Sequence, residues 1–192
     1  GNLCNASPAA DGVPALLALD AEVELRSQAG QRLMALDAFI LGNRKTALQP
    51  DEMVTAIHIP RKVLSGTSAF RKLGARRYLV ISIAMVAARL VTDPEGRITD
   101  ASVSVGSCSA VAQRLRQLEA TLIGLRTPGE IDRAIGSDPL APLTPIDDVR
   151  GSAGYRLAVA RELVRRTVRD ALGLAEAEAA ALTFTAMPSP SR

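Results

Sequence analysis

The sequence predicts an α+β protein, in which a small mixed N-terminal part precedes an antiparallel β-meander packed with about three helices. Two observations lead to this fold class. Strand-like patterns separated by turn signals dominate residues 21–107, and apolar residues at helical spacing follow over 111–172. The chain of 192 residues is 47% hydrophobic, which is enough to bury a core. We expect the N-terminal part to span 1–60, the meander part 61–173 and a disordered tail 174–192.

The opening residues predict an anion site at the start of a helix. Gly1-Asn2 leaves backbone amides open to close approach, and Ser7 followed by Pro8 is typical of an N-cap and a first helical residue. Free amides and the positive end of the helix dipole favour a phosphate at such a place. The alternative is a glycine turn before an ordinary helix, with no ligand.

A short helix and a hairpin are expected next. Residues 13–19 are apolar almost all round, which predicts a buried helix beginning near Pro14. Apolar and charged residues alternate over 21–27, the pattern of a strand with one solvated face. A turn at 28–30 leads to a partner strand over 32–35, so these residues predict a β-hairpin.

The N-terminal part then closes with a loop and a strand. Residues 39–48 have no clear period and are expected to form a positively charged loop. Residues 53–59 alternate again and end at Pro60, which cannot continue a central strand. The polar stretch 60–66, with its Pro and Gly, is the expected boundary between the two parts.

Three strand-like runs, 68–73, 80–91 and 98–107, predict the meander. The last two flank Asp93-Pro94-Glu95-Gly96, which suits a type I turn with proline second and glycine fourth. The two long runs are therefore expected to pair antiparallel.

Two helices are expected after the strands. Val111, Leu115, Leu118 and Leu122 fall at helical spacing. Residues 127–130, Thr-Pro-Gly-Glu, form a capping box with proline at the first helical position.

A long third helix is expected over 152–172, packed against the meander. Its predicted apolar stripe consists of Tyr155, Val159, Leu163, Val164, Val168 and Leu172. Its other positions carry Arg156, Arg161, Arg165, Arg166 and Arg169. Glu162 and Asp170 interrupt these arginines, which favours a solvated or subunit-facing surface over a nucleic-acid stripe.

The reactive side chains do not form a catalytic constellation. His58 is the only histidine and lies in a predicted strand with nothing nearby in sequence to orient it, so a structural or surface role is favoured. Asp147-Asp148 precede the long helix and are interpreted as cap and dipole partners rather than an acidic site. Cys4 and Cys108 lack metal-ligand spacing, which favours a reducing compartment, and Cys4 is expected to be a small buried residue.

Composition and hydropathy disfavour both a nucleic-acid-binding protein and a membrane-spanning one. The formal net charge is +3, but two Tyr, three Phe and no Trp leave few rings to stack bases, so nucleic-acid binding is disfavoured. The longest apolar stretch, 79–88, contains Ser82 and stops at Arg89, too short to cross a bilayer. No signal peptide is visible, and we expect a cytoplasmic protein.

Several segments in the same order resemble one known family. They are GNLCNASPAAD at 1–11, GNRKT at 42–46 with LQPDE at 48–52, FRK at 70–72, IS at 81–82, and PIDDVRGS at 145–152 with YR at 155–156. The chain resembles the FAD-binding medium subunit of the molybdenum hydroxylases, the xanthine dehydrogenase and carbon monoxide dehydrogenase family. The resemblance implies a partial FAD-binding α+β subdomain followed by the flavoprotein's C-terminal meander domain.

Cofactor contacts are also implied by this resemblance. Gly1 and Asn2 match the end of a Gly-Gly-Asn loop whose backbone holds FAD, and Asp11 matches a carboxylate that contacts the cofactor. Val54 falls where the family touches FAD through its backbone. Lys72 is the choice for the family's flavin-proximal lysine, with Arg71 as the alternative because of a nearby length difference.

The family's segments before Gly1 are not in this sequence: a further glycine and strand, and a first subdomain with a second glycine-rich phosphate loop. We therefore expect this chain alone to bind FAD weakly or not at all and to be inactive, because lost amide contacts to phosphate are strong hydrogen bonds.

By resemblance, the chain is an oxidoreductase subunit. Its FAD would relay electrons from iron–sulfur clusters to NAD or another acceptor, while molybdenum and iron–sulfur centres belong to a large molybdopterin subunit and a small iron–sulfur subunit. Two alternatives stay open: a flavin-free interaction module of the same fold, and a basic nucleic-acid-binding protein.

Overall fold

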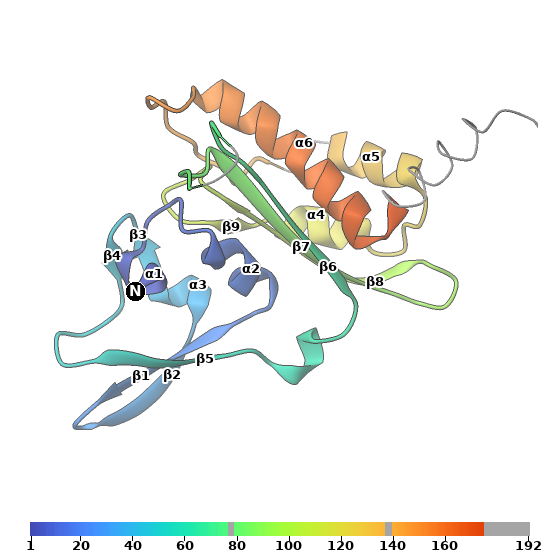
Figure 1. Cartoon of the computed structure of the whole chain (residues 1–192). Helices are drawn as coiled ribbons and strands as arrows, with labels where there is room; N and C mark the ends of the chain where they lie inside the picture. Colours follow the sequence, from blue (N-terminus) through green and yellow to red (C-terminus); the bar gives the residue numbers. More distant parts are fainter. Residues whose placement is uncertain (77–78, 137–139, 175–192) are drawn as a thin grey trace, which may run out of the picture.

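The fold is organised around one antiparallel sheet that separates a helical layer from the N-terminal part (Figure 1). The computed structural model describes residues 1–76, 79–136 and 140–174, so the tail predicted to be disordered lies outside the described residues apart from residue 174. In the order of the sheet, the strands are β6 (Thr67–Leu73), β7 (Ala84–Thr92), β8 (Ile98–Gly106) and β9 (Gln113–Arg114). The helices of the covering layer are α4 (Arg116–Leu122), α5 (Pro128–Gly136) and α6 (Ala153–Ala171).

β7 lies at the centre of the sheet and is buried on both faces. Every residue from Ala84 to Leu90 is buried, because α6 packs on one side and the N-terminal helix α2 (Gly12–Ala18) on the other. A strand covered on both faces reads as a continuous apolar run rather than an alternating one. This coverage explains the unbroken apolar segment around residues 84–88.

The predicted meander is confirmed for three strands, with two corrections. The second strand begins at Ala84 rather than at residue 80. The predicted helix around Val111 to Leu122 begins only at Arg116, because Gln113 and Arg114 pair with β8 as a fourth strand. The amide of Leu115 donates to the Val103 carbonyl at 2.8 Å, so sheet pairing overrides the helical spacing at this point.

The predicted turns and caps of this part are present. The Gly96 amide donates to the Asp93 carbonyl at 3.0 Å, which closes the turn between β7 and β8. In the capping box, the Thr127 amide donates to Glu130 Oε2 at 2.9 Å and the Glu130 amide to Thr127 Oγ1 at 3.4 Å. The Tyr155 amide donates to Ser152 Oγ at 3.2 Å, so Ser152 is the N-cap of α6.

The buried stripe of α6 differs from the predicted stripe at its first turn. Tyr155 is 48% exposed, whereas Arg156 is 3% exposed. Arg156 lies four residues before Ala160, which heads the buried positions Ala160, Val164, Val168 and Ala171. Arg156 therefore belongs to the buried face of α6 and not to the solvated or subunit-facing surface expected for the arginines of this helix.

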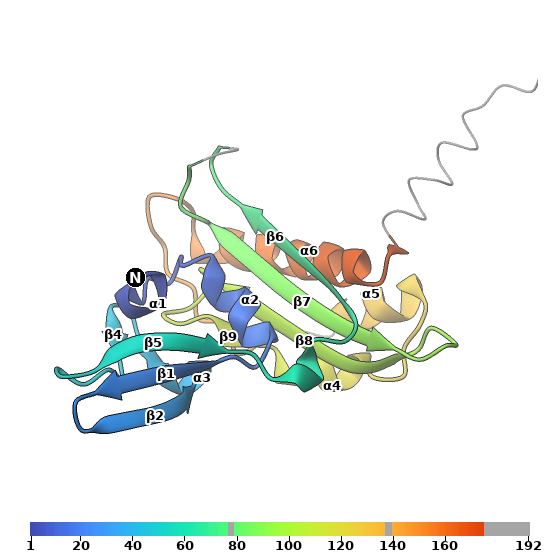
Figure 2. The same cartoon turned by 60° about the horizontal axis from the view of Figure 1, so that its bottom comes forward.

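The N-terminal part contains a second, three-stranded sheet. Its strands, in sheet order, are β2 (Gly30–Ala35), β1 (Glu22–Ser27) and β5 (Met53–His58). Smaller elements are α1 (Asn2–Asn5), α3 (Leu36–Phe39), β3 (Ile40–Gly42), β4 (Lys45–Thr46) and the 3-10 turn η1 (Arg61–Val63). The β1–β2 hairpin is as predicted. Figure 2 shows this sheet beside α2, and in Figure 1 it lies on the opposite side of α2 from α5 and α6.

Two expectations for this part are wrong. Ser7 and Pro8 do not begin a helix: the Ala10 amide closes a single turn onto the Ser7 carbonyl at 3.0 Å, and the helix begins at Gly12. The stretch predicted as a loop over 39–48 contains the β3–β4 hairpin, in which Arg44 adopts a positive φ of 56°. A hairpin with strands of three and two residues has too few residues for a readable period.

α2 holds the N-terminal part against the central sheet. Gly106 allows the close approach, because a Cβ at this position would lie 2.7 Å from Pro14 Cγ of α2. Arg114 adds a polar link: Nη1 donates to the Leu17 carbonyl and to Asp20 Oδ1, each at 2.8 Å, and Nε donates to Glu119 Oε1.

Candidate functional site

Asp11 connects the opening segment of the chain, residues 1–11, to two strands of the central sheet. Its Oδ2 accepts from Lys72 Nζ of β6 at 2.5 Å, and its Oδ1 accepts from Ser82 Oγ, just before β7, at 2.6 Å. These partners are 61 and 71 residues away in the chain. The structure therefore brings together two predicted site residues, Asp11 and Lys72, and adds Ser82. We call these three residues the Asp11 group.

Asp11 is also the N-cap residue of α2, yet its side chain makes no cap hydrogen bond. An aspartate at this position ordinarily accepts from an amide in the first turn. Here both carboxylate oxygens are directed to Lys72 and Ser82 instead. The Asp11 side chain is 46% exposed and that of Lys72 is 32% exposed, so the pair remains accessible to a ligand.

The two candidates for the flavin-proximal cation bind different partners. Arg71 pairs with Asp170 of α6, on the helical side of the sheet. Lys72, the next residue of β6, pairs with Asp11 of the N-terminal part. Successive side chains of a strand point to opposite faces, which accounts for this division. The geometry favours Lys72, whose role toward FAD stays a prediction.

The other predicted contacts lie at different distances from Asp11 in the fold. Asn2 is close, since a Cβ on Gly12 would lie 3.5 Å from Asn2 Oδ1. Gly1 is exposed, and its carbonyl accepts from the Asn5 amide at 2.9 Å. Val54 belongs to β5 in the other sheet, where it pairs with Leu25 and packs against the N-terminal core. Their roles toward FAD also stay predictions.

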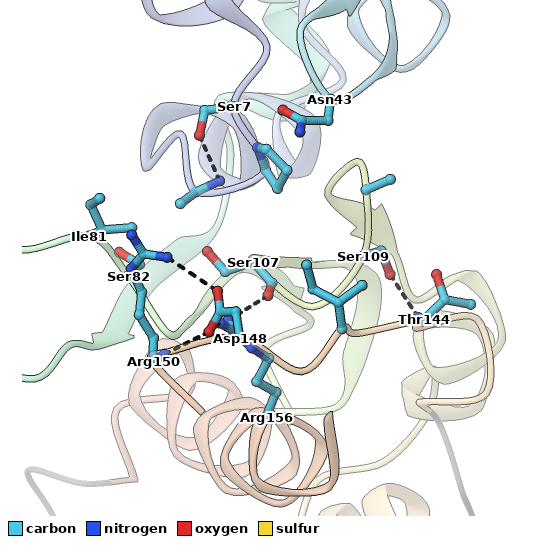
Figure 3. A pocket seen from close by; sticks show the side chains of 14 residues that line it. Ser7, Asn43, Ile81, Ser82, Ser107, Ser109, Thr144, Asp148, Arg150 and Arg156 are labelled. Atoms are coloured by element: carbon cyan, nitrogen blue, oxygen red, sulfur yellow. Dashed lines mark hydrogen bonds and ion pairs between the residues drawn. The ribbon is translucent and has the colours of Figure 1, made fainter. Parts of the chain in front are cut away.

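A cavity of about 520 Å³ adjoins the Asp11 group (Figure 3). Its lining comes from four stretches of chain and one residue of the β3–β4 turn: residues 7–9, 81–82, parts of 107–110, parts of 144–156, and Asn43. Ser82 contributes to both the cavity and the Asp11 group. Most of these stretches are the segments on which the family resemblance rests, so the motif residues, distant in sequence, share one cavity.

Asp148, Arg150 and Arg156 are the charged side chains of the described cavity lining. Asp148 Oδ1 accepts from the Arg150 amide at 2.8 Å and from Arg156 Nη2 at 2.7 Å. The amide of Arg150, and then the guanidinium of Arg156, hold the pKa of Asp148 below its ordinary value. Asp148 is thus a cavity residue, while its neighbour Asp147 accepts from the Ala153 amide at the start of α6, as predicted for a cap partner.

Sequence reasoning did not assign a role to Ser107 or Arg156. Ser107 is 8% exposed and has a positive φ of 62°. Its Oγ has no hydrogen-bond partner among the described residues. Arg156 was grouped with the exposed arginines of the last helix. Its position in the sequence, four residues before the buried stripe of α6, could have indicated that Arg156 is buried.

The remaining reactive residues lie elsewhere. Cys4 is exposed, so its expected burial is wrong, and Cys108 is buried, which raises the pKa of its thiol to about 11. His58 is exposed in β5, where its Nε2 lies 3.2 Å from Glu24 Oε2. Arg165 and Arg166 both bind Glu162. Among the described residues, no group of three or more His, Cys, Asp or Glu could hold a metal ion, and no helix is long and apolar enough to cross a membrane.

Two family models match the chain. Residues 1–62 match the FAD binding domain in molybdopterin dehydrogenase. Residues 52–171 match the CO dehydrogenase flavoprotein C-terminal domain.

Individual relatives agree with these matches. The nicotine 6-hydroxylase medium subunit of Paenarthrobacter nicotinovorans is 33% identical over 172 residues, which cover 89% of this chain and 59% of the relative. The carbon monoxide dehydrogenase medium chain of Afipia carboxidovorans is 31% identical over 174 residues, with the same coverage of 89% and 59%. A structure of reconstituted CO dehydrogenase from Oligotropha carboxidovorans superposes with a TM-score of 0.82 at 28% identity, over 90% of this chain and 60% of that one.

The chain spans about three fifths of the length of these relatives, 59% in both curated proteins. Within that span, the antiparallel sheet covered by helices agrees with the fold of the CO dehydrogenase structure, which superposes with a TM-score of 0.82. The CO dehydrogenase flavoprotein model alone matches residues 52–171, more than half of the 192 residues. The chain therefore belongs to the family of FAD-binding medium subunits of the molybdenum hydroxylases.

Proposed function

We propose that this chain is the flavin-binding, electron-relaying component of a molybdenum hydroxylase. The observation that carries the proposal is the Asp11 group, in which an accessible carboxylate, an ammonium and a hydroxyl converge from three distant segments beside a cavity. Family membership supplies the cofactor class. FAD provides the electron-transfer chemistry, and the protein provides position and polarity.

The residues of the site fit FAD by their donor and acceptor chemistry. The Asp11 carboxylate can accept hydrogen bonds from sugar-alcohol hydroxyls, and Lys72 can donate to a carbonyl or phosphate oxygen. Asn2 offers an amide beside them. A Cβ at Gly1 would meet nothing within 4 Å, so backbone there is open to close approach. We propose Gly1, Asn2, Asp11 and Lys72 as cofactor contacts, with Val54 as a further backbone contact.

We propose the cavity as the place where an electron acceptor, NAD or another oxidant, approaches the flavin. The cavity shares Ser82 with the Asp11 group, which places its volume next to the proposed flavin contacts. Its rim carries the half-exposed Ile81 and the exposed Ile146 together with Arg150. Apolar surface with a few placed polar groups is the usual lining of a small-molecule site.

The parent assembly is proposed from the relatives' names, which describe medium subunits or chains. Electrons would arrive from a small iron–sulfur subunit, and a large subunit would hold the molybdopterin cofactor. We place this assembly in the cytoplasm. We also propose residues 1–60 as the FAD-binding half and 61–173 as the C-terminal domain, and expect residues 1–192 alone to be inactive.

The test is an absorbance spectrum of the purified chain from about 300 to 550 nm, before and after mixing with FAD and desalting, followed by a fluorescence titration. We expect weak, saturable FAD binding. Asp11→Asn should weaken it about tenfold, because an uncharged amide loses the ion pair with Lys72 and a charge-assisted acceptor.

The matched control is Asp51→Asn, which removes an exposed carboxylate from a turn outside the site. Equal losses in both variants would mean that net charge, rather than the Asp11 group, governs affinity. A chain that shows no saturable FAD binding, yet binds an iron–sulfur subunit, would instead be a flavin-free interaction module.

A further inference from the structure

β7 and β8 separate at one end of their ladder, and Arg156 lies where they separate. We call Ser82 and Ile83, just before β7, the β7 arm, and Ser107, just after β8, the β8 arm. Met85 and Gly106 form the last pair of the ladder. Immediately beyond it, the carbonyls of Ile83 and Ser107 both accept from Arg156 Nη1, at 2.5 and 3.0 Å. One guanidinium nitrogen thus satisfies two strand-end carbonyls that no longer face a ladder partner.

The opening segment is held between the two arms. On the β8 arm, the Ser107 amide donates to the Pro8 carbonyl at 3.0 Å. On the β7 arm, Ser82 Oγ donates to Asp11 Oδ1 at 2.6 Å. Each arm therefore carries, next to the carbonyl bound by Arg156, a donor that holds the segment from Pro8 to Asp11.

The position of Arg156 is itself strongly determined. Its side chain is 4% exposed, and burial of a charge at this depth requires compensation by acceptors. Asp148 provides the countercharge at 2.7 Å, and reciprocal Asp148–Gly151 backbone hydrogen bonds of 3.2 Å close the turn that presents it. A planar guanidinium can reach two carbonyls and a carboxylate from one fixed position, which a lysine ammonium cannot do.

We infer that Arg156 is a positioning residue for Asp11: its guanidinium fixes the separation of the β7 and β8 ends and thereby sets Ser82 and Ser107 against the opening segment. This inference rests on the proposed function insofar as Asp11 is a flavin contact. The contacts that carry it concern only residues of this chain. Arg156 itself does not touch Asp11 and acts through the two arms.

The test compares Arg156→Lys with Arg166→Lys, a matched exchange at a position of α6 whose side chain is 55% exposed. Hydrogen exchange is measured on peptides covering 5–12 and 104–109, and FAD affinity by fluorescence titration. We expect Arg156→Lys to speed hydrogen exchange in both peptides about tenfold, because a lysine cannot bind both strand-end carbonyls and Asp148 at once. The exchange of peptides from α5 should be unchanged. FAD affinity should fall about tenfold, and Arg166→Lys should change neither quantity.

A second variant, Ser82→Ala, keeps Arg156 and removes only the β7-arm link to Asp11. If the action of Arg156 runs through this arm, the double variant should lose much less affinity than the sum of the single losses. Additive losses, or unchanged exchange over 5–12 in Arg156→Lys, would overturn the inference.

The two proposals fail separately. If the unaltered chain shows no FAD binding but Arg156→Lys selectively exposes 5–12 and 104–109, the proposed function is contradicted and the positioning role stands. If the chain binds FAD and neither measurement distinguishes Arg156→Lys from Arg166→Lys, the positioning role is contradicted alone. Should Arg156→Lys fail to fold, the exchange of 5–12 in Ser82→Ala decides whether the arm holds the opening segment.

Discussion

The two faces of the central sheet are covered in different ways. On one face, α4, α5 and α6 bury a continuous apolar cluster that includes Leu122 and Ile131, both 0% exposed. On the other face, α2 packs closely, but the N-terminal part is also joined to the sheet by polar links at Arg114 and Asp11. The difference teaches that apolar packing stabilises the helical face, whereas directional contacts between distant segments place the candidate site.

Directional links have a specific consequence for function. Apolar contacts tolerate small displacements, but a hydrogen bond weakens steeply outside a narrow range of distance and angle. The Asp11 group is built from links of this kind, between residues more than 60 positions apart. The N-terminal face can therefore position a ligand-binding carboxylate accurately, and it should also be the face more easily disturbed without unfolding the helical layer.

The largest effect should come from breaking the buried polar link between the faces. Arg114→Met removes the buried cation that pairs with Glu119, whose side chain is 8% exposed, and with Asp20. Each carboxylate then keeps only its longer ion pair with the exposed Arg116, at 3.6 and 4.0 Å. Breaking a buried ion pair by removing one partner typically costs about 3 to 5 kcal/mol. We expect a loss of that size in the free energy of unfolding by urea denaturation.

The neighbouring Arg116→Gln is the control, because its side chain is 62% exposed and exposed ion pairs contribute at most about 1 kcal/mol. The double variant Arg114→Met with Glu119→Gln should recover part of the stability, since no carboxylate is then left buried and charged. A small loss for Arg114→Met would show that the link between the faces is mainly apolar.

On the helical face, Leu122→Ala should cost about 3 kcal/mol, through lost apolar burial and the cavity left behind. Ile123→Ala is the adjacent control, because Ile123 is 47% exposed. Urea denaturation again gives the free energies of unfolding. FAD affinity of the folded Leu122→Ala protein should be unchanged, and a selective loss of affinity would mean that the two faces are not separable in this way.

The contrast between the faces also explains how much of the structure could be predicted. Strand-like runs, the β7–β8 turn and the capping box reveal strands and helices of the meander part, because each depends on residues close in sequence. β9 was missed because it has only two residues, whose pairing with β8 depends on the sheet already being present. The helix start expected at Ser7-Pro8 is wrong because Ser7 closes a separate turn, whereas α2 begins at Gly12, close to the start expected near Pro14.

The candidate site was less accessible to sequence reasoning. Asp11 and Lys72 were named only through the family resemblance, and their contact joins residues 61 positions apart. Nothing local indicates that Ser82 binds Asp11, or that Arg156 is buried where β7 and β8 separate. Such contacts depend on the completed fold, so a single sequence contains no local pattern for them.

A smaller effect should come from the N-cap of α6, the helix that carries Arg156. Ser152→Ala removes the acceptor for the Tyr155 amide and should cost about 1 kcal/mol in the free energy of unfolding. Ser152→Thr keeps a hydroxyl acceptor and serves as the control. Because Asp147 still accepts from the Ala153 amide, the first turn of α6 should persist, and FAD affinity should change less than in Arg156→Lys.

The smallest effect concerns the capping box of α5, far from the N-terminal face. The Thr127 amide and hydroxyl, together with the Arg126 amide, lower the pKa of Glu130 from 4.5 to about 2. A carboxylate whose pKa is lowered by folding stabilises the protein above its unfolded pKa, and this contribution disappears as the pH falls through the folded value. Glu130→Gln should therefore be slightly less stable than the unaltered chain at neutral pH, and the difference should vanish between about pH 4.5 and 2.

Urea denaturation at several pH values measures this difference, with Glu95→Gln, which removes an exposed carboxylate from the β7–β8 turn, as the matched control. Because α5 lies in the helical layer, the hydrogen exchange of the 5–12 peptide in Glu130→Gln should equal that in the unaltered chain at each pH at which the chain is folded. A pH-dependent opening of that peptide would mean that the helical layer and the Asp11 group respond as one unit, and the distinction between the two faces would then be wrong.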